Sequence, residues 1–205
     1  MDGERFSAAA GLPWDARVFD RAEAAGVAAV QRLVLERPRS TDAERLPLFL
    51  DAILADLGIR PGERRGAAER IAAEHLRSNL WSRAYADAAA TLEALARRGY
   101  RMGVVSNADG RVRGLLDRAG LAPFLEVVVD SSEVGFEKPD PRIFRAATDR
   151  LDLPADACAY VGDIYEIDVL GARAAGMRPI LIGTGAAPED VDRVARLPEL
   201  LALFP

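Results

Sequence analysis

Two aspartates stand five residues apart in VGDIYEIDVLGARAAG, which covers residues 161–176. Asp163 directly follows an apolar run, and Asp168 falls in the first turns of the helix expected next. Two carboxylates at this spacing can converge on one hard cation, because Mg²⁺ needs only one or two protein carboxylates when waters and phosphate oxygens complete its shell. Glu166 lies between them and can assist. In the alternative interpretation the aspartates merely cap the helix, although a cap needs only one.

Two further segments contain polar or charged residues of types that can bind phosphate. Ser106 and Asn107 end the apolar run of VVSNADG, where a hydroxyl and nearby N–H groups can hold a phosphoryl oxygen. The same pair is also ordinary turn chemistry. Lys138, in GFEKPDPRIF, directly precedes a helix start formed by Asp140 and a proline. A lysine there can serve as a point charge for a phosphate or for a carboxylate nucleophile, although a loop lysine is usually just solvated.

The apolar pattern beyond residue 84 alternates between the periods of strands and helices. It predicts strands over residues 101–106, 124–129, 158–162 and 178–183, helices between them, and a last helix near 188–196. Such alternation is typical of an α/β fold with a doubly wound parallel sheet, in which ligands bind beyond the carboxyl ends of the strands. The groups at those ends are Ser106-Asn107, Asp130-Ser131-Ser132, Asp163 and Gly183-Thr184-Gly185.

The first 84 residues contain only helical patterns. Asp15 is a plausible N-cap for one helix, and Thr41 with Glu44 has capping-box spacing before another, in which Pro47 can introduce a kink. No β-branched, strand-like run occurs in this region. We therefore expect a helical region over residues 1–84 and an α/β region over residues 85–205.

Charge, apolar runs and cysteine content argue against several classes of protein. The net charge of −5 and the absence of a basic stripe argue against nucleic acid as a partner. No run is long and apolar enough for a membrane span, and the N-terminus lacks the pattern of a signal peptide. Cys158 is the only cysteine, which excludes an internal disulfide. These features predict a cytoplasmic, enzyme-sized protein with no membrane partner and leave its oligomeric state open.

The ordered motifs VVSN, GFEKPDPRIF and VGDIYEIDVLGARAAGM together resemble those of the haloacid dehalogenase (HAD) superfamily of hydrolases, which are mostly phosphatases. The resemblance implies a Rossmann-like core over residues 85–205 and identifies residues 1–84 with the early helical cap of one subgroup. It also implies that Ser106 binds the phosphoryl group, that Asn107 helps to position it, and that Lys138 stabilises charge. Asp163 and Asp168 would anchor Mg²⁺, and the substrate would be a small phosphorylated metabolite.

One part of the family pattern is absent from this sequence. Members begin with a strand that ends in an Asp-x-Asp type motif, whose first aspartate forms an aspartyl-phosphate. Here the only early candidate is Asp2, and no apolar strand precedes it. The resemblance implies that the absent strand is central, between residues 102–106 and 157–161. We expect a sheet that lacks this strand or closes the two neighbours against each other.

Two explanations stand for the absent nucleophile: a start truncated upstream of Met1, which we favour, or a natural chain that has become a binding or regulatory protein. A metal-free haloacid dehalogenase is a third reading, which the aspartate pair disfavours because a cation helps phosphoryl transfer more than halide displacement. Substrate identity is not readable. Trp14, His75, Trp81 and Arg83 are candidates to contact it from the cap, although each is more typical of packing or surface.

Overall fold

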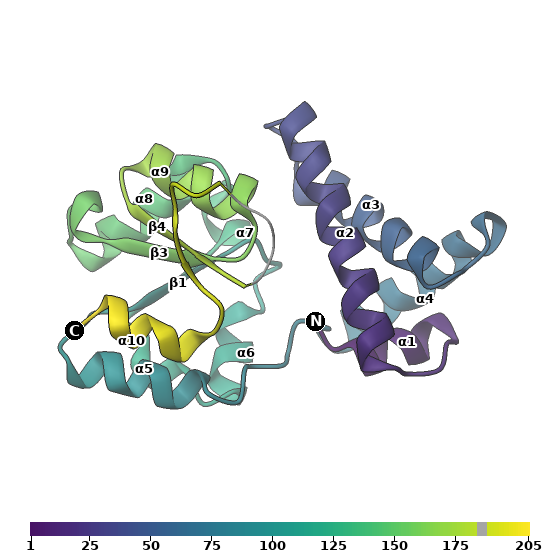
Figure 1. Cartoon of the computed structure of the whole chain (residues 1–205), viewed down its shortest axis with the longest axis horizontal. Helices are drawn as coiled ribbons and strands as arrows, with labels where there is room; N and C mark the ends of the chain where they lie inside the picture. Colours follow the sequence, from purple (N-terminus) through teal and green to yellow (C-terminus); the bar gives the residue numbers. More distant parts are fainter. Residues whose placement is uncertain (184–187) are drawn as a thin grey trace. The chain divides into compact units, whose positions relative to one another are not determined.

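The computed structural model describes residues 1–183 and 188–205. The chain forms two compact units, Met1–Arg83 and Ala84–Pro205, each with its own hydrophobic core (Figure 1). Within the described residues, no helix combines the length and the apolar character needed to cross a bilayer. Thr184 and Gly185, which were expected at a strand end, lie outside the described residues.

The first unit is entirely helical in its regular structure. Its helices are α1 (Gly3–Ala10), α2 (Ala16–Glu36), α3 (Asp42–Asp56) and α4 (Pro61–Arg77). Helices α2 and α3 run side by side (Figure 1). A Cβ atom on Gly26 would lie 2.7 Å from the ring of Phe49 and 2.9 Å from Ile53, so glycine permits this close approach. Apolar side chains of all four helices fill the core, among them Phe6, Ala22, Ile53, Leu54 and Ile71.

Helices α2 and α3 of the first unit begin at the capping residues that the sequence indicates. The Asp15 carboxylate accepts hydrogen bonds from the N–H groups of residues 17 and 18. Thr41 and Glu44 form the expected capping box, and Pro47 is accommodated inside α3. Helix α1 was not expected. The Asp2 carboxylate accepts from the Arg5 N–H at 3.3 Å and caps it, so Asp2 begins a helix here and does not end a strand.

The second unit alternates strands and helices as expected. Its strands are β1 (Gly103–Ser106), β2 (Val127–Asp130), β3 (Ala159–Gly162), β4 (Arg178–Ile182) and β5 (Asp192–Val194). The main helices are α5 (Ala88–Arg97), α6 (Val112–Arg118), α8 (Pro141–Leu151) and α9 (Leu170–Ala175), with short helices α7 (Ser131–Val134) and α10 (Leu200–Leu203). Single turns are η1 (Ala122–Phe124), η2 (Ala155–Ala157), η3 (Tyr165–Val169) and η4 (Leu197–Glu199). Helices α8 and α9 lie on one side of the strands, and α5 and α10 lie on the other (Figure 1).

All strand pairs are parallel, but they form two separate ladders. β1 pairs with β2, with Ser106 opposite Asp130. β4 lies between β3 and β5 in a three-stranded ladder. Within the described residues no strand pairing joins β1 to β3, and the first strand of the second unit is β1. A side chain spans the two ladders, because the Tyr160 hydroxyl lies 3.1 Å from the Val105 carbonyl oxygen.

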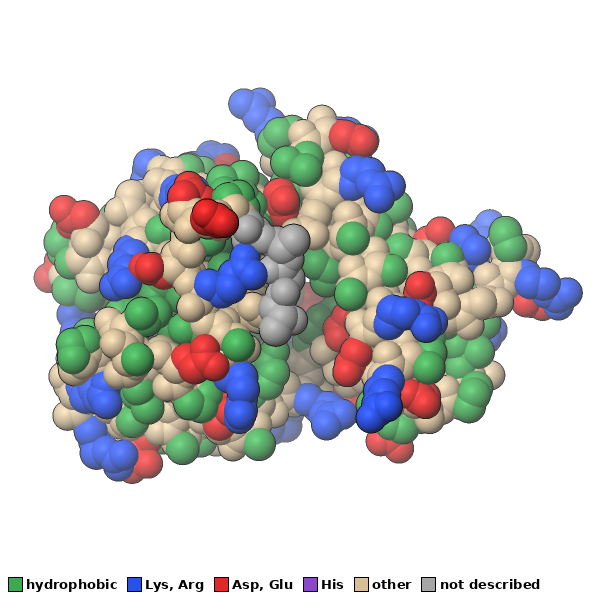
Figure 2. All heavy atoms as spheres, in the orientation of Figure 1, with side chains coloured by type: hydrophobic (Ala, Val, Ile, Leu, Met, Phe, Trp, Pro, Cys, Tyr) green, Lys and Arg blue, Asp and Glu red, His purple; other side chains and the backbone are tan. Residues whose placement is uncertain are grey.

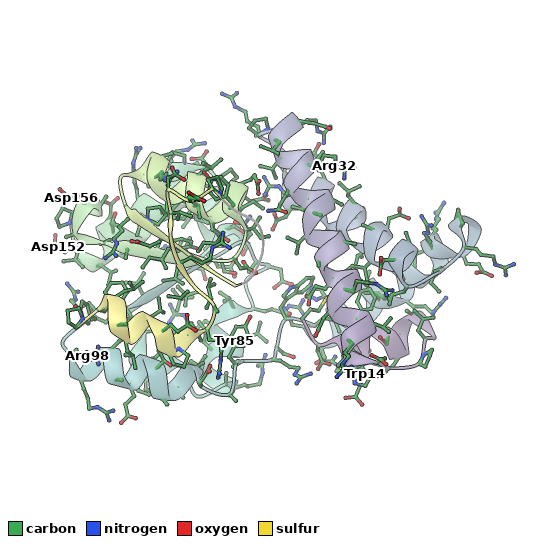
Figure 3. All side chains as sticks on the ribbon, in the orientation of Figure 1. Trp14, Arg32, Tyr85, Arg98, Asp152 and Asp156 are labelled. Atoms are coloured by element: carbon green, nitrogen blue, oxygen red, sulfur yellow. The ribbon has the colours of Figure 1, made fainter. Side chains whose placement is uncertain are left out.

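The helix expected near residues 188–196 is wrong. Strand β5 occupies part of this range and pairs with β4, and the last helix is α10. Pairing with β4 satisfies the backbone of β5 and buries Val194 against Ile180 and Leu200. The C-terminal end of α10 is held by Arg98, labelled in Figure 3, which donates hydrogen bonds to the carbonyl oxygens of Leu201 and Phe204.

Charged side chains of both signs cover the surface. On the face drawn in Figure 2, arginines and acidic residues are interspersed, without a continuous basic stripe. Many of them form exposed ion pairs, such as Arg21 with Asp56 and Arg97 with Glu93. Exposed pairs contribute little to stability, so they do not explain the fold.

Candidate active site

The second unit places two of the predicted positions at the carboxyl ends of its strands and a third in a loop that contacts the end of β1. Ser106 is the last residue of β1, and Asp163 follows the last residue of β3. Lys138 stands in the loop between α7 and α8. That loop is followed by the expected helix start, where the Asp140 carboxylate accepts from the Arg142 N–H at 2.9 Å. The sequence prediction of these elements is therefore confirmed at the residues that matter for the site.

Asn107 contacts the backbone of Lys138 on both sides. Its Oδ1 accepts a hydrogen bond from the Lys138 N–H at 2.7 Å, and its Nδ2 donates to the Lys138 carbonyl oxygen at 3.2 Å. This pair of hydrogen bonds connects the end of β1 to the lysine loop. The Asn107 amide thus holds the Lys138 backbone, and its role in positioning a phosphoryl group, which the family resemblance implies, stays a prediction.

The Lys138 ammonium lies within a small polar cluster. Nζ is 2.8 Å from Asp168 Oδ1 and 3.0 Å from the Tyr160 hydroxyl oxygen. Burial lowers the pKa of Lys138, but Tyr160 and Asp168 outweigh this effect and raise its pKa above the ordinary value. The ammonium is therefore charged at neutral pH.

Asp168 is the most deeply buried carboxylate of this cluster, at 2% exposure. Its Oδ1 faces Lys138, and its Oδ2 accepts from the N–H groups of Asp163 and Ile164 at 3.0 and 2.9 Å. The carboxylate thus fixes the turn that follows β3. Ile164, and neither aspartate, occupies the N-cap of the helical turn η3.

Two glycines make this arrangement possible. A Cβ atom on Gly162 would lie 2.4 Å from both Cβ and Cγ of Asp168. A Cβ atom on Gly171 would lie 2.6 Å from the Phe144 ring and 3.0 Å from the Pro139 Cα. Only glycine allows such contacts, so one position admits Asp168 and the other admits the loop that carries Lys138.

Asp163 presents its carboxylate at the surface beside this cluster. The surrounding protein desolvates it, and together with the nearby Asp168 carboxylate this raises the pKa of Asp163, while Lys138 opposes the rise. Carboxylate oxygens next to each other are a donor set that suits a hard divalent cation. Within the described residues, however, no three His, Cys, Asp or Glu side chains are grouped as a metal site, so Glu166 does not complete one.

Residues at the end of β2 hold the loop that follows Ser106, and sequence reasoning did not assign them this role. The buried Asp130 carboxylate accepts from the Gly110 N–H at 2.8 Å. Ser131 Oγ accepts from the Ala108 N–H at 3.0 Å. The polar run after a buried strand was a usable signal, because a wholly buried β2 ending in a carboxylate requires nearby donors.

The scarcity of lysine in the sequence is a second signal that points to this site. Lys138 is the only lysine among the 27 lysine and arginine residues of the chain. Arg supplies every other basic position, so residue 138 departs from the usage of the whole chain. Lysine is a compact point charge, whereas the planar guanidinium of arginine presents a wide fork of donors. Nζ lies within hydrogen-bond distance of the Tyr160 and Asp168 oxygens, and a compact ammonium suits such contacts.

Three of the four residues suggested as substrate contacts, Trp14, His75 and Trp81, take part in local packing, whereas Arg83 is exposed. His75 Nδ1 accepts a hydrogen bond from the Leu80 N–H at 3.3 Å, and its ring lies edge-on to Trp81 with centroids 5.3 Å apart. Trp14 packs against Phe19. These contacts agree with the packing role that was the more typical reading.

Comparison with known proteins identifies related sequences. A sequence model described as haloacid dehalogenase-like hydrolase matches residues 8–176. The phosphoserine phosphatase of Thermus thermophilus is 38% identical over 138 residues, which cover 67% of this chain and 54% of that protein. Haloacid dehalogenase-like hydrolase domain-containing protein 3 of Bos taurus is 37% identical over 126 residues, covering 58% of this chain and 49% of that protein. The chain thus spans about half the length of these curated relatives.

A solved structure shares the fold at lower sequence identity. A magnesium-bound HAD hydrolase of Bacillus subtilis superimposes with a TM-score of 0.70 at 17% identity, covering 97% of this chain and 87% of that one. At this identity the likeness supports the fold alone.

Proposed function

Because the chain belongs to the haloacid dehalogenase-like hydrolase family, we propose that its second unit carries most of the active site of a Mg²⁺-dependent phosphatase. The observation that carries this proposal is the Lys138–Asp168 ion pair, at 2.8 Å, beside the exposed Asp163. Relatives named phosphoserine phosphatase and glyceraldehyde 3-phosphate phosphatase support the same reaction class. The proposed substrate is a small phosphorylated metabolite.

Each site residue has a role that follows from its chemistry. Ser106 offers a hydroxyl to a phosphoryl oxygen, and Lys138 supplies a positive charge to the same group. Asn107 holds the loop that carries Lys138, and Asp130 holds the loop that follows Ser106. The exposed Asp163 would contact Mg²⁺ directly, and the buried Asp168 carboxylate would contribute negative charge to the same site. When bound, the cation neutralises charge that develops on the phosphoryl oxygens.

The proposed reaction proceeds through an aspartyl-phosphate. A carboxylate attacks phosphorus, the alcohol leaves, and water then releases phosphate from the acyl-phosphate. By the family pattern, this carboxylate belongs to a strand between β1 and β3, and within the described residues Asp2 instead caps α1. This observation favours a second candidate function, in which the chain binds phosphate and metal but does not turn over a substrate.

A direct test compares turnover with binding. Phosphate release from p-nitrophenyl phosphate is measured with Mg²⁺, with EDTA, and in the Asp163→Asn variant. The phosphatase proposal expects release that both EDTA and the substitution abolish, whereas Asp156→Asn, a change on the exposed turn η2 (Figure 3), leaves it unaltered. Activity that persists in EDTA contradicts the metal requirement.

Calorimetric binding of Mg²⁺ and inorganic phosphate separates the two candidate functions. Binding without turnover, lost in Asp163→Asn and in Lys138→Met, supports the non-catalytic function. Absence of both turnover and binding rejects the proposed site altogether.

A further inference from the structure

The hydroxyl of Tyr160 lies at the junction of the two strand ladders. Tyr160 belongs to β3, and its Oη is 3.1 Å from the carbonyl oxygen of Val105 in β1. The same oxygen is 3.0 Å from Lys138 Nζ and 3.5 Å from Asp168 Oδ1. One atom therefore connects the lysine to two ladders that share no strand pairing in the described part of the chain.

The direction of these hydrogen bonds follows from the protons available. The Lys138 ammonium can only donate, so the Tyr160 oxygen accepts from Nζ. The single phenolic proton then has two possible acceptors, and Val105 at 3.1 Å is well placed whereas Asp168 at 3.5 Å is at the outer limit of a hydrogen bond. The bonds therefore run from Lys138 through Tyr160 to the carbonyl of the residue before Ser106.

The Tyr160 side chain is a fixed group. Its ring lies edge-on to Phe144, with centroids 4.7 Å apart and an interplanar angle of 81°. Burial raises the pKa of Tyr160 to about 12, so the phenol remains a neutral donor at neutral pH. Lysine, by contrast, has a long flexible side chain whose head group needs acceptors to stay in one place.

We propose that Tyr160 is a positioning residue: its hydroxyl, anchored on the Val105 carbonyl, holds Lys138 Nζ beside Asp168 and ties it to the strand that ends at Ser106. The consequence for catalysis rests on the proposed phosphatase function, whereas the positioning of the ammonium does not. Removal of the hydroxyl alone leaves Lys138 with fewer acceptors and the Val105 carbonyl without this donor.

The single lysine permits a direct test. Protein labelled with ¹⁵Nζ- and ¹³Cε-lysine carries the label only at Lys138, so one ammonium signal reports its environment by NMR. Exchange of the ammonium protons with water is measured in the wild type, in Tyr160→Phe, and in Tyr100→Phe. The last variant loses a hydroxyl that contacts the Pro205 carbonyl at 3.4 Å and has no part in the cluster. Circular dichroism and thermal unfolding confirm the fold of each.

We expect exchange to become at least about tenfold faster in Tyr160→Phe, because the ammonium loses one hydrogen-bond acceptor and a loss of about 1.4 kcal/mol corresponds to tenfold. Tyr100→Phe should exchange as the wild type does. An unchanged rate in a folded Tyr160→Phe protein overturns the proposal. If that variant does not fold, the wild type decides: a nuclear Overhauser effect between the Lys138 ε-methylene and the Tyr160 ring supports the proposal, and its absence overturns it.

Activity distinguishes this proposal from the proposed function. If the wild type hydrolyses p-nitrophenyl phosphate, Tyr160→Phe should lower kcat more than it changes KM, because the ammonium acts on the reacting group. If the wild type hydrolyses none, the phosphatase function fails, and the ammonium exchange still decides whether Tyr160 positions Lys138.

Discussion

At the scale of single residues, the proposed site depends on a glycine, which has no side chain to obstruct its neighbours. Gly162 leaves room for the Asp168 carboxylate, which in turn accepts two backbone N–H groups and the Lys138 ammonium. A buried carboxylate with fewer partners would be costly, so the ion pair and the turn stabilise each other. The position of the Asp168 carboxylate therefore depends on the glycine at position 162.

Gly162→Ala should displace Asp168. The added Cβ atom would lie 2.4 Å from the Asp168 side chain, and overpacking of this kind costs about 1–3 kcal/mol. We expect a lower midpoint of urea unfolding and loss of the proposed Mg²⁺ binding. Gly66→Ala in α4 is the matched control. A Cβ atom added there would lie 3.7 Å from the Arg70 side chain, and alanine favours a helix. Full Mg²⁺ affinity in Gly162→Ala would show that Asp168 does not need this space.

Asn107→Ala should release the lysine loop. The change leaves the Lys138 N–H and carbonyl without the amide partner, and an unsatisfied polar group costs about 1–3 kcal/mol. We expect faster backbone hydrogen exchange in residues 135–140 while α8 keeps its protection, as measured by mass spectrometry. Unchanged exchange in that loop would mean that the amide does not hold it.

At the scale of elements, caps and glycines determine where helices begin and strands end. Helix α8 begins where the sequence Asp140-Pro141 predicts a helix start. The Arg142 side chain donates a hydrogen bond to the Asp140 carboxylate, which also caps the helix. By contrast, α1 and β5 were not expected from local pattern. β5 spans only three residues, Asp192–Val194, and exists because β4 offers it a pairing edge.

The cap of α8 should give the protein an acid-dependent stability. The Arg142 side chain and backbone hold the pKa of Asp140 below its ordinary value of 3.8. A carboxylate with a lowered folded-state pKa stabilises the fold above its unfolded pKa, and this contribution is lost as pH falls through the folded pKa. We expect Asp140→Asn to be less stable than the wild type at pH 7, and the difference to shrink as pH falls below 3.8, the ordinary pKa of the carboxyl.

Urea unfolding at a series of pH values measures this effect. Asparagine keeps the capping function, so the Asn variant tests the charge alone. Asp140→Ala removes the cap as well and should lose about 1 kcal/mol more. A constant difference between Asp140→Asn and the wild type at every pH would contradict the assigned role of the charge.

At the scale of the whole molecule, two cores form within one chain. One is built from helices of Met1–Arg83 and the other from strands and helices of Ala84–Pro205. The proposed site residues Ser106, Lys138, Asp163 and Asp168 all belong to the second unit. The polar cluster around Lys138 therefore lies entirely within the second unit.

Limited chymotrypsin digestion should cut first between the two cores. Residues 78–87 form neither helix nor strand, and Trp81 and Tyr85 are 45% and 72% exposed there. Tyr85 is labelled in Figure 3. Proteolysis favours exposed segments with little regular structure. Mass spectrometry of the first products should show two fragments that divide in this segment. A first cut within α2 or within α8 would contradict the division into two cores.

The sequence by itself determined the family, the α/β class, the helix starts at Asp15, Thr41 and Asp140, and which polar residues end the strands. These features depend on neighbours within a few positions, so local pattern encodes them. Only the tertiary structure decided that Asn107 holds the Lys138 backbone, that Tyr160 meets Val105, and that residues 192–194 form a strand. Those contacts join residues far apart in the chain, where no local preference specifies a partner and packing alone selects it.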